Sequence, residues 1–251
     1  MDLSIVIPAY NEADKVAHDI EAAAAFLMLN QLTGEVIVVD DGSDDDTAGA
    51  AEAADVPDEV RCEVIRYTPN RGKGFAIKTG MAATTGTYAL FADVGLCVPF
   101  DNSLRGLEAI RRGECEIAHG SRKLPDSVLV RKQHPLRRFL SWLFRKAAGL
   151  MMGIPRHLSD TQCGFKVYRG DVARELYAAC RTEGFMFDIE ILLRALRRGY
   201  RVMEFPVQWR CDFDSRLHPA HDGSDAFSEL RRIKRQLKDE EKADSGSPPS
   251  A

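Results

Sequence analysis

Three short apolar segments, each ending in polar residues, constrain the fold of this chain most. They cover residues 4–12, 35–43 and 87–93, and they are rich in β-branched or aromatic residues and too short for core helices. Such segments are typical of buried parallel strands. Ligands of open α/β sheets bind at the carboxyl ends of the strands, so the acidic residues at these ends predict a nucleotide site. Acidic residues 44–46, just before the helix that Thr47 opens, are better interpreted as helix N-caps.

Length and composition narrow the class of protein. A chain of 251 residues with 45% hydrophobic residues can bury a full α/β core, and we expect one domain. The net charge of -4 argues against a general nucleic-acid binder, which needs a basic surface. The six cysteines have no CxxC spacing and no signal peptide precedes them, so we expect reduced thiols in a cytosolic protein and no structural zinc site. Apolar stretches are interrupted by charge well before the roughly 20 residues that a membrane span requires.

Strands and helices alternate up to about residue 120. Strands are predicted near residues 3–8, 35–40 and 62–67, with helices to about residues 30 and 55 between them. Residues 70–74, Asn-Arg-Gly-Lys-Gly, then open a helix to about residue 84. This segment lacks the spacing of a P-loop, so taken alone it fits a phosphate-binding loop or an ordinary turn with a solvated lysine equally well.

Five segments in matching order carry a family resemblance: residues 5–12, 38–47, 70–74, 120–122 and 160–166. Together they resemble the motif series of inverting family-two glycosyltransferases, most closely the dolichyl-phosphate glucosyl- and mannosyltransferase branch. Residues 187–190 and 206–209 extend the likeness to about residue 216. The resemblance implies a single GT-A (Rossmann-like) α/β domain with a mostly parallel central sheet flanked by helices. It also implies a nucleotide-sugar donor and a polyprenyl-phosphate acceptor.

The resemblance implies a role for each matching donor-site residue. Residues around the base and ribose of the donor would be Pro8, Ala9, Tyr10 and Glu12. Asp40, or its neighbour Asp41, would read the nucleobase, with Gly42 and Ser43 shaping the loop beside it. Lys73 would stand near the diphosphate. The basic residues that would bind donor or acceptor phosphate are Arg122, Arg210 and Arg216, because a planar guanidinium meets phosphate oxygens at two points.

The chain departs from the family where a metal ion should bind. The family usually has Asp-X-Asp after this strand, but here Asp93 is followed by Gly95 at the second acidic position. Mg²⁺ or Mn²⁺ could still be held by Asp93 with donor phosphates and waters. Alternatively, arginine and lysine neutralise the leaving diphosphate without a metal ion, or the activity has been lost.

The implied mechanism is a single in-line displacement at the anomeric carbon, with inversion. A lipid phosphate acceptor is already anionic and needs no general base, whereas a hydroxyl acceptor does. Asp160 is the leading candidate for that base from its place in the family motif, and Asp188 and Glu190 are the next choices. Glu190 continues into an amphipathic helix, so we expect its charge to face water.

Two segments suggest attachment to a membrane surface. Residues 131–146 combine Arg and Lys with Trp, Phe and Leu at helical spacing, which is typical of an interfacial segment and equally of a helix packed on the sheet. We expect a transferase domain over residues 1–222, an amphipathic helix over 223–238 that docks on the domain or on a membrane, and a disordered tail over 239–251. The expected location is cytoplasmic, peripheral at the inner face of a membrane.

The sequence thus favours a hexosyltransferase that uses a nucleotide-diphosphate sugar and a polyprenyl or dolichyl phosphate. The likeness of residues 160–166 to the glucosyl branch favours UDP-glucose over GDP-mannose. Two alternatives remain: a nucleotide-sugar-binding pseudoenzyme, suggested by Gly95, and a transferase that acts on a soluble hydroxyl acceptor.

Overall fold

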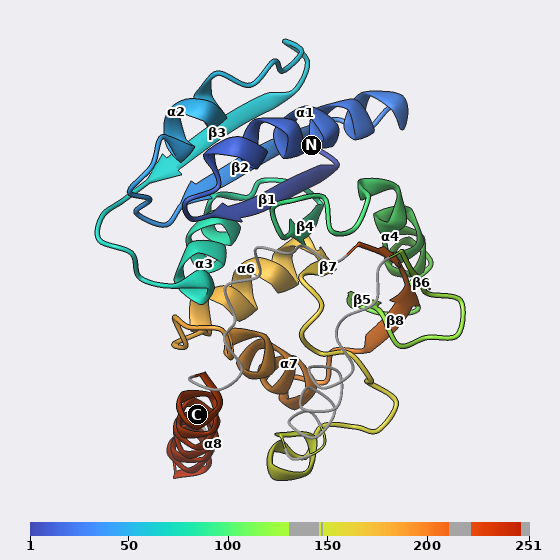
Figure 1. Ribbon diagram of the computed structural model, residues 1–251. Coiled ribbons are helices and arrows are strands. Elements are labelled where there is room, and N and C mark those ends of the chain that lie inside the picture. Colours follow the sequence, from blue (N-terminus) through green and yellow to red (C-terminus); the bar gives the residue numbers. More distant parts are fainter. Residues whose placement is uncertain (131–145, 147, 211–221, 247–251) are drawn as a thin grey trace, which may run out of the picture. The chain divides into compact units, whose positions relative to one another are not determined.

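A computed structural model of the protein describes residues 1–130, 146, 148–210 and 222–246. The chain divides into two compact parts. One comprises Met1–Lys132 and Leu158–Phe213, and the other comprises Gln133–His157 and Asp214–Ala251. Figure 1 shows the first part as an α/β fold around a twisted central sheet. This confirms the predicted fold class.

The central sheet has seven strands in the order β3-β2-β1-β4-β7-β5-β8. All neighbours pair in parallel except β7, which runs antiparallel to both β4 and β5. The strands of this sheet are β1 (Leu3–Ala9), β2 (Gly34–Asp40), β3 (Arg61–Arg66), β4 (Tyr88–Ala92), β5 (Ile117–Ser121), β7 (Phe165–Arg169) and β8 (Val202–Pro206). A separate two-stranded sheet pairs β6 (Val128–Leu129) with β9 (Gln208–Trp209). The three apolar segments singled out from the sequence are β1, β2 and β4.

Helices cover both faces of the central sheet (Figure 1). One face carries α1 (Ala13–Leu29), α2 (Thr47–Glu52), the 3₁₀ turn η1 (Phe100–Asn102) and α4 (Ser103–Arg111). The other face carries α3 (Lys73–Ala83), α6 (Gly170–Ala179) and α7 (Phe187–Arg197). Helices α1 and α3 begin and end close to the predicted positions.

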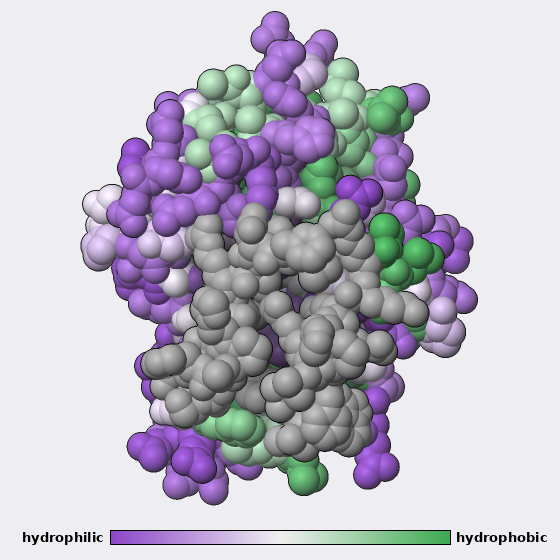
Figure 2. Space-filling model, in the orientation of Figure 1, coloured by the Kyte–Doolittle hydropathy of each residue, from purple (hydrophilic) through white to green (hydrophobic). Residues whose placement is uncertain are grey.

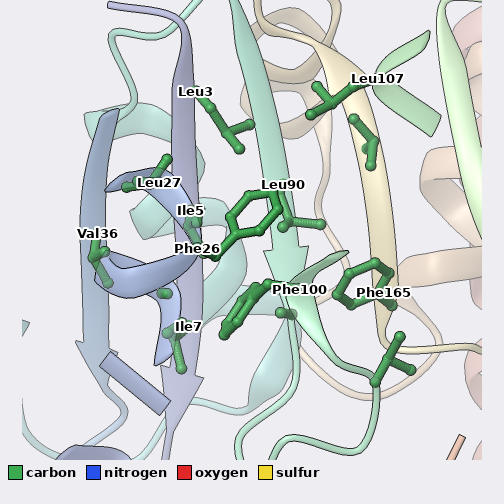
Figure 3. Close-up of a cluster of buried hydrophobic side chains, with 14 of the residues drawn as sticks. Leu3, Ile5, Ile7, Phe26, Leu27, Val36, Leu90, Phe100, Leu107 and Phe165 are labelled. Atoms are coloured by element: carbon green, nitrogen blue, oxygen red, sulfur yellow. The ribbon is translucent and has the colours of Figure 1, made fainter. Parts of the chain in front are cut away.

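Side chains alternate between the two faces of the sheet along each buried strand, which explains why helices cover both faces. Leu3, Ile5 and Ile7 of β1 point to the α1 face, where they pack with Phe26 and Leu27 of α1 (Figure 3). Val6 points to the other face, where the close approach of α3 leaves no room for a side chain at Gly80. The side chains on both faces of β1 are fully buried, which accounts for the continuous apolar run in the sequence.

Helix α8 (Asp222–Gly246) belongs to the second part and is longer than the predicted amphipathic helix. The expectation of a disordered tail from residue 239 is therefore wrong for residues 239–246, because glutamate, lysine and alanine there are good helix formers. Leu230, Ile233 and Leu237, which lie at helical spacing on the predicted amphipathic helix, are buried. Residues 247–251 and most of the basic segment 131–146 lie outside the described residues.

On the side drawn in Figure 2, the described surface is mostly hydrophilic with separate hydrophobic areas. The most exposed large apolar residues include Leu29, at the end of α1, and Val130, after β6. Within the described part of the chain, we find no helix that is both long enough and apolar enough to cross a membrane.

Candidate active site

The motif segments meet at one edge of the central sheet. Strands β1, β2, β4, β5 and β8 all end at this edge, and the antiparallel β7 begins there. The sheet topology therefore brings together segments that are far apart in the sequence, which are residues 8–12, 40–43, 93–97, 120–122, 160–166 and 206–210. This is the edge at which open α/β sheets bind their ligands.

The loops after β1 and β2 are joined by hydrogen bonds. The amide N–H of Asn11 donates to Oγ of Ser43 (2.8 Å), and Oδ1 of Asn11 accepts from the amide of Asp44 (2.7 Å). The amide of Glu12 donates to Oγ1 of Thr47 (2.8 Å). The structure thus brings residues 8–12 and 40–43 side by side, as the donor-site prediction requires. Among the acidic residues 44–46, Asp46 is the N-cap of α2 but its side chain makes no capping hydrogen bond, so the predicted capping role is not confirmed; Asp45 accepts from the amide of Thr47 (3.1 Å).

Asp41 anchors the loop that precedes α3. Its Oδ1 accepts from the hydroxyl of Tyr67 (2.7 Å) and the amide of Arg71 (2.9 Å). Its Oδ2 accepts from the side-chain amide of Asn70 and the backbone amide of Gly72 (both 2.9 Å). A carboxylate has about four acceptor positions, so these four donors fill them. Asp41 therefore fixes the Asn-Arg-Gly-Lys-Gly segment.

Asp40 is buried at the end of β2 and has fewer partners. Its Oδ1 accepts from the amide of Ser43 (2.9 Å). Its Oδ2 lies 3.2 Å from Nε of Arg66, an ion-pair distance, but makes no hydrogen bond of good geometry among the described residues. Of the two adjacent carboxylates, Asp40 is the one that retains acceptor capacity.

Lys73 and Asp93 form an ion pair at the partly exposed centre of the site. Nζ of Lys73, the first residue of α3, lies 2.6 Å from Oδ1 of Asp93, which follows β4. Burial lowers the pKa of Lys73, but the Asp93 carboxylate raises it more, so its pKa lies above the ordinary value. Lys73 is therefore fully charged at neutral pH.

The loop after Asp93 lacks the second carboxylate of the family motif. Gly95 has φ +95°, a left-handed conformation that an aspartate would adopt only with strain, and its amide donates to the buried carboxylate of Asp19 (3.0 Å). The amide of Leu96 donates to the same carboxylate (2.9 Å). Within the described ranges, no three His, Cys, Asp or Glu side chains are grouped so that they could hold a metal ion. With Asp93 paired to Lys73, the residues that the structure describes do not form the carboxylate set of a divalent metal site.

Arg122 and Asp160 form a two-point ion pair between the loop after β5 and the segment before β7. Nε and Nη2 of Arg122 donate to the two carboxylate oxygens of Asp160 (both 2.7 Å), and the amide of Arg122 adds a third bond (2.9 Å). Burial alone would raise the pKa of Asp160, but Arg122 lowers it more, so its pKa lies below the ordinary value. A carboxylate held in this way is a weak proton acceptor.

Asp188 and Glu190, the other two base candidates, are both buried in α7. Asp188 pairs with Lys166 of β7, and burial nevertheless raises its pKa above the ordinary value. Glu190 accepts from the amides of Arg181 (3.0 Å) and Thr182 (2.8 Å). The expectation that Glu190 faces water is therefore wrong, because its carboxylate binds the backbone ahead of the helix.

Arg210 lines a largely apolar groove of about 410 Å³. Its backbone amide donates to the carbonyl of Cys97 (2.8 Å), in the loop that follows Asp93. The groove runs between α1, residues 96–101 and the small β6–β9 sheet, and its lining includes Ala25, Leu29 and Val130 as well as Asp101. Arg216, the other predicted phosphate-binding arginine of this region, lies outside the described residues.

Three contributors to the site were not identified from the sequence. Asp19 holds the loop at Gly95; its position within the apolar stripe of α1 is the signal that could have revealed it. Glu204 of β8 accepts from the amide of Asp160 (2.6 Å) and so positions that carboxylate. Gly164 packs against Asp93 so closely that an added Cβ would lie 1.8 Å from its Oδ2.

Comparisons with known proteins agree with this geometry. The family model for glycosyl transferase family 2 matches residues 4–177. A dolichyl-phosphate beta-glucosyltransferase of Saccharomyces cerevisiae is 32% identical over 82% of this chain, which spans 66% of that protein. A protein of the same name from Dictyostelium discoideum is 30% identical over 92% of the chain, which spans 73% of its length.

Among solved structures, glucosyl-3-phosphoglycerate synthase from Mycobacterium tuberculosis, in complex with Mg²⁺ and uridine diphosphate, superposes with a TM-score of 0.65. It is 18% identical, and the match covers 94% of this chain and 78% of that one. At this identity the likeness shows a shared fold. The motif geometry and the family match together lead to one conclusion: this chain belongs to glycosyl transferase family 2.

Proposed function

We propose that the protein transfers glucose from UDP-glucose to a polyprenyl phosphate, with inversion at the anomeric carbon. The observation that carries the proposal is the Arg122–Asp160 ion pair. The leading candidate for a general base is engaged by a guanidinium and has a lowered pKa, so the site suits an acceptor that brings its own anionic oxygen. The names of the relatives, dolichyl-phosphate beta-glucosyltransferases, support the same acceptor and sugar.

The donor would lie across the carboxyl ends of β1, β2 and β4. Residues Pro8, Ala9, Tyr10 and Glu12 would surround its base and ribose, next to the loop that Gly42 and Ser43 shape. Asp40 is the better candidate to read the uracil edge, because all acceptor positions of Asp41 are filled by the 67–72 loop. The diphosphate would then reach Lys73.

In the displacement, an oxygen of the acceptor phosphate forms a bond to the anomeric carbon while the bond to the diphosphate breaks on the opposite side. The leaving electron pair stays on the diphosphate, so cationic groups that face the diphosphate accelerate the step. Arg122 uses Nε and Nη2 to bind Asp160, and its Nη1 would bind a phosphate oxygen. Arg210 would bind the acceptor phosphate, and Arg216 is proposed for the same task.

The groove beside Arg210 supports a lipid acceptor. Its walls are largely apolar, and the main chain of Arg210, which lines the groove, is bonded to the loop after Asp93. We propose that the first prenyl units lie in this groove while Arg210 holds the phosphate. Peripheral membrane binding, through the basic segment 131–146 and the exposed cationic side chains of α8, would deliver such an acceptor.

The experiment is a transfer assay with radiolabelled UDP-glucose and GDP-mannose against polyprenyl phosphate, the matching polyprenol and soluble hydroxyl acceptors. We expect label from UDP-glucose to move to the lipid phosphate only. Transfer to the polyprenol or to a soluble hydroxyl would contradict the base-free mechanism. Donor binding without any transfer, in buffers with and without Mn²⁺, would favour the second candidate, a nucleotide-sugar-binding protein without turnover, which Gly95 suggests.

A further inference from the structure

The metal-motif carboxylate, Asp93, forms an ion pair with a lysine of the chain. Asp93 is held in place from two sides: its amide donates to the carbonyl of Gly164 (2.9 Å), and the absence of a Cβ at Gly164 gives its carboxylate room. Nζ of Lys73 lies 2.6 Å from Oδ1 of Asp93. The two side chains are 25% and 33% exposed, while Oδ1 of Asp93 itself is buried and makes no hydrogen bond of good geometry among the described residues, so the contact is an ion pair.

The main chain around Lys73 is equally well fixed. The amides of Arg71 and Gly72, directly before it, both donate to Asp41 (2.9 Å each). Gly72 has φ +104°, and an added Cβ there would lie 2.7 Å from the carbonyl oxygen of Glu183, so the turn requires glycine. The ammonium group is thereby presented at a fixed place beside Asp93.

Lysines of the chain balance the two described carboxylates around this pair. Gly95 contributes no ligand, and its amide is bound by Asp19. The Lys73 ammonium balances Asp93, while the next carboxylate, Asp188, is balanced by Lys166. Two carboxylates at this place would call for a divalent ion to offset both charges, whereas a single carboxylate is offset by one lysine.

We propose that Lys73 performs the task of the divalent cation in this chain, so that donor binding and transfer proceed without a metal ion. The proposal rests on the proposed function. Lys73 contacts the donor diphosphate and stabilises the negative charge that builds on it as the bond to the anomeric carbon breaks. Asp93 orients the ammonium group and, with its own charge satisfied, holds no ion. The alternative is that Asp93 binds Mg²⁺ or Mn²⁺ with donor phosphates and waters.

The test combines calorimetric binding of UDP-glucose with the transfer assay, each in EDTA and in Mn²⁺. We expect the wild-type protein to bind donor and to transfer glucose equally well in both. Lys73→Met keeps most of the length of the side chain and removes the charge. It should weaken donor binding in EDTA by about tenfold or more, the loss expected for one charge-assisted hydrogen bond. Mn²⁺ should restore part of this loss, because Asp93 is then free to hold the ion.

Two further variants serve as controls. Lys73→Arg retains the charge and should remain independent of metal. Lys78→Met lies on the same helix, where Nζ of Lys78 donates to the carbonyl of Cys180 (2.7 Å), and it should leave metal independence unchanged. Thermal melting of each variant verifies that it is folded.

Two results would overturn the proposal: wild-type binding and transfer that require Mn²⁺, or unchanged donor affinity of Lys73→Met in EDTA. Absence of transfer in both buffers would count against the proposed function instead, and the binding data would still decide the role of Lys73.

Discussion

Arg122 and Asp160 are joined by two side-chain hydrogen bonds of 2.7 Å, one to each carboxylate oxygen. The amide of Asp160 in turn donates to Glu204 (2.6 Å), so the carboxylate is fixed from β8 as well. In the proposed mechanism, this geometry makes Asp160 a positioning residue for Arg122.

The first prediction follows from this pairing. Asp160→Asn and Arg122→Met should each lower kcat/KM for polyprenyl phosphate by about tenfold or more, and the double variant should be little worse than either, because both changes remove one coupled unit. Steady-state kinetics of the three variants measure this coupling. Independent, multiplicative losses would mean that Asp160 acts on its own, as a base would.

A second prediction concerns Gly164. Alanine at this position would place Cβ 1.8 Å from Oδ2 of Asp93, so the carboxylate must turn away and the Lys73 pair is lost. We expect Gly164→Ala to weaken UDP-glucose binding several-fold in calorimetry, with little change in the melting temperature, because a side-chain end moves and not the backbone. Gly149→Ala is the control, since a Cβ there meets no atom within 4 Å. Equal donor affinity of the two variants would contradict the role given to Asp93.

A third prediction concerns the pH dependence of stability. Burial raises the pKa of Asp19 to about 6, an effect that the amides of Gly95 and Leu96 offset only in part. The folded protein therefore holds this proton more tightly than the unfolded chain, so the stability that Asp19 contributes is full below about pH 4 and is lost as pH rises through about 6.

Asparagine cannot titrate at this position. The free energy of unfolding of Asp19→Asn, relative to the wild type, should therefore rise between about pH 4 and about pH 7, by at most about 3 kcal/mol. Urea unfolding of both proteins over this range measures the difference. A difference that is independent of pH would show that Asp19 does not titrate in this way.

A fourth prediction tests the apolar groove. Ala25 is exposed on α1 and lines the groove, so Ala25→Glu adds a charge there with little effect on stability. We expect KM for a long polyprenyl phosphate to rise several-fold, while KM for a phosphate with one short prenyl group changes little. Equal effects on both acceptors would exclude the groove as the place of the prenyl chain.

Much of the fold could be predicted because buried parallel strands have a clear pattern. The apolar runs that became β1, β2 and β4 end in the polar residues that form the sheet edge of the site, and the family motifs located Lys73, Arg122 and Asp160. The helix over residues 239–246 was missed because low apolar content was taken as a sign of disorder.

The partners within the site could not be predicted from the sequence. Asp41 cannot be told from its neighbour Asp40 in the sequence. Yet the acceptor positions of the Asp41 carboxylate are filled by donors from residues 67–72, about 30 positions further along the chain. The carboxylate of Asp19 accepts from the amide of Gly95, 76 positions away. The burial of Glu190 depends on the segment before α7, whose amides bind its carboxylate. Such contacts depend on how loops pack at the end of the sheet, which periodicity and local propensity do not describe.

The most direct test of the account is the structure of the reaction product. The protein should be incubated with UDP-glucose and a polyprenyl phosphate, and the lipid fraction analysed by proton and phosphorus NMR. We predict a single glucosyl phosphate diester with the β configuration, inverted from the α-linked donor. An α-linked product, or glucose attached to anything other than the lipid phosphate, would contradict the account.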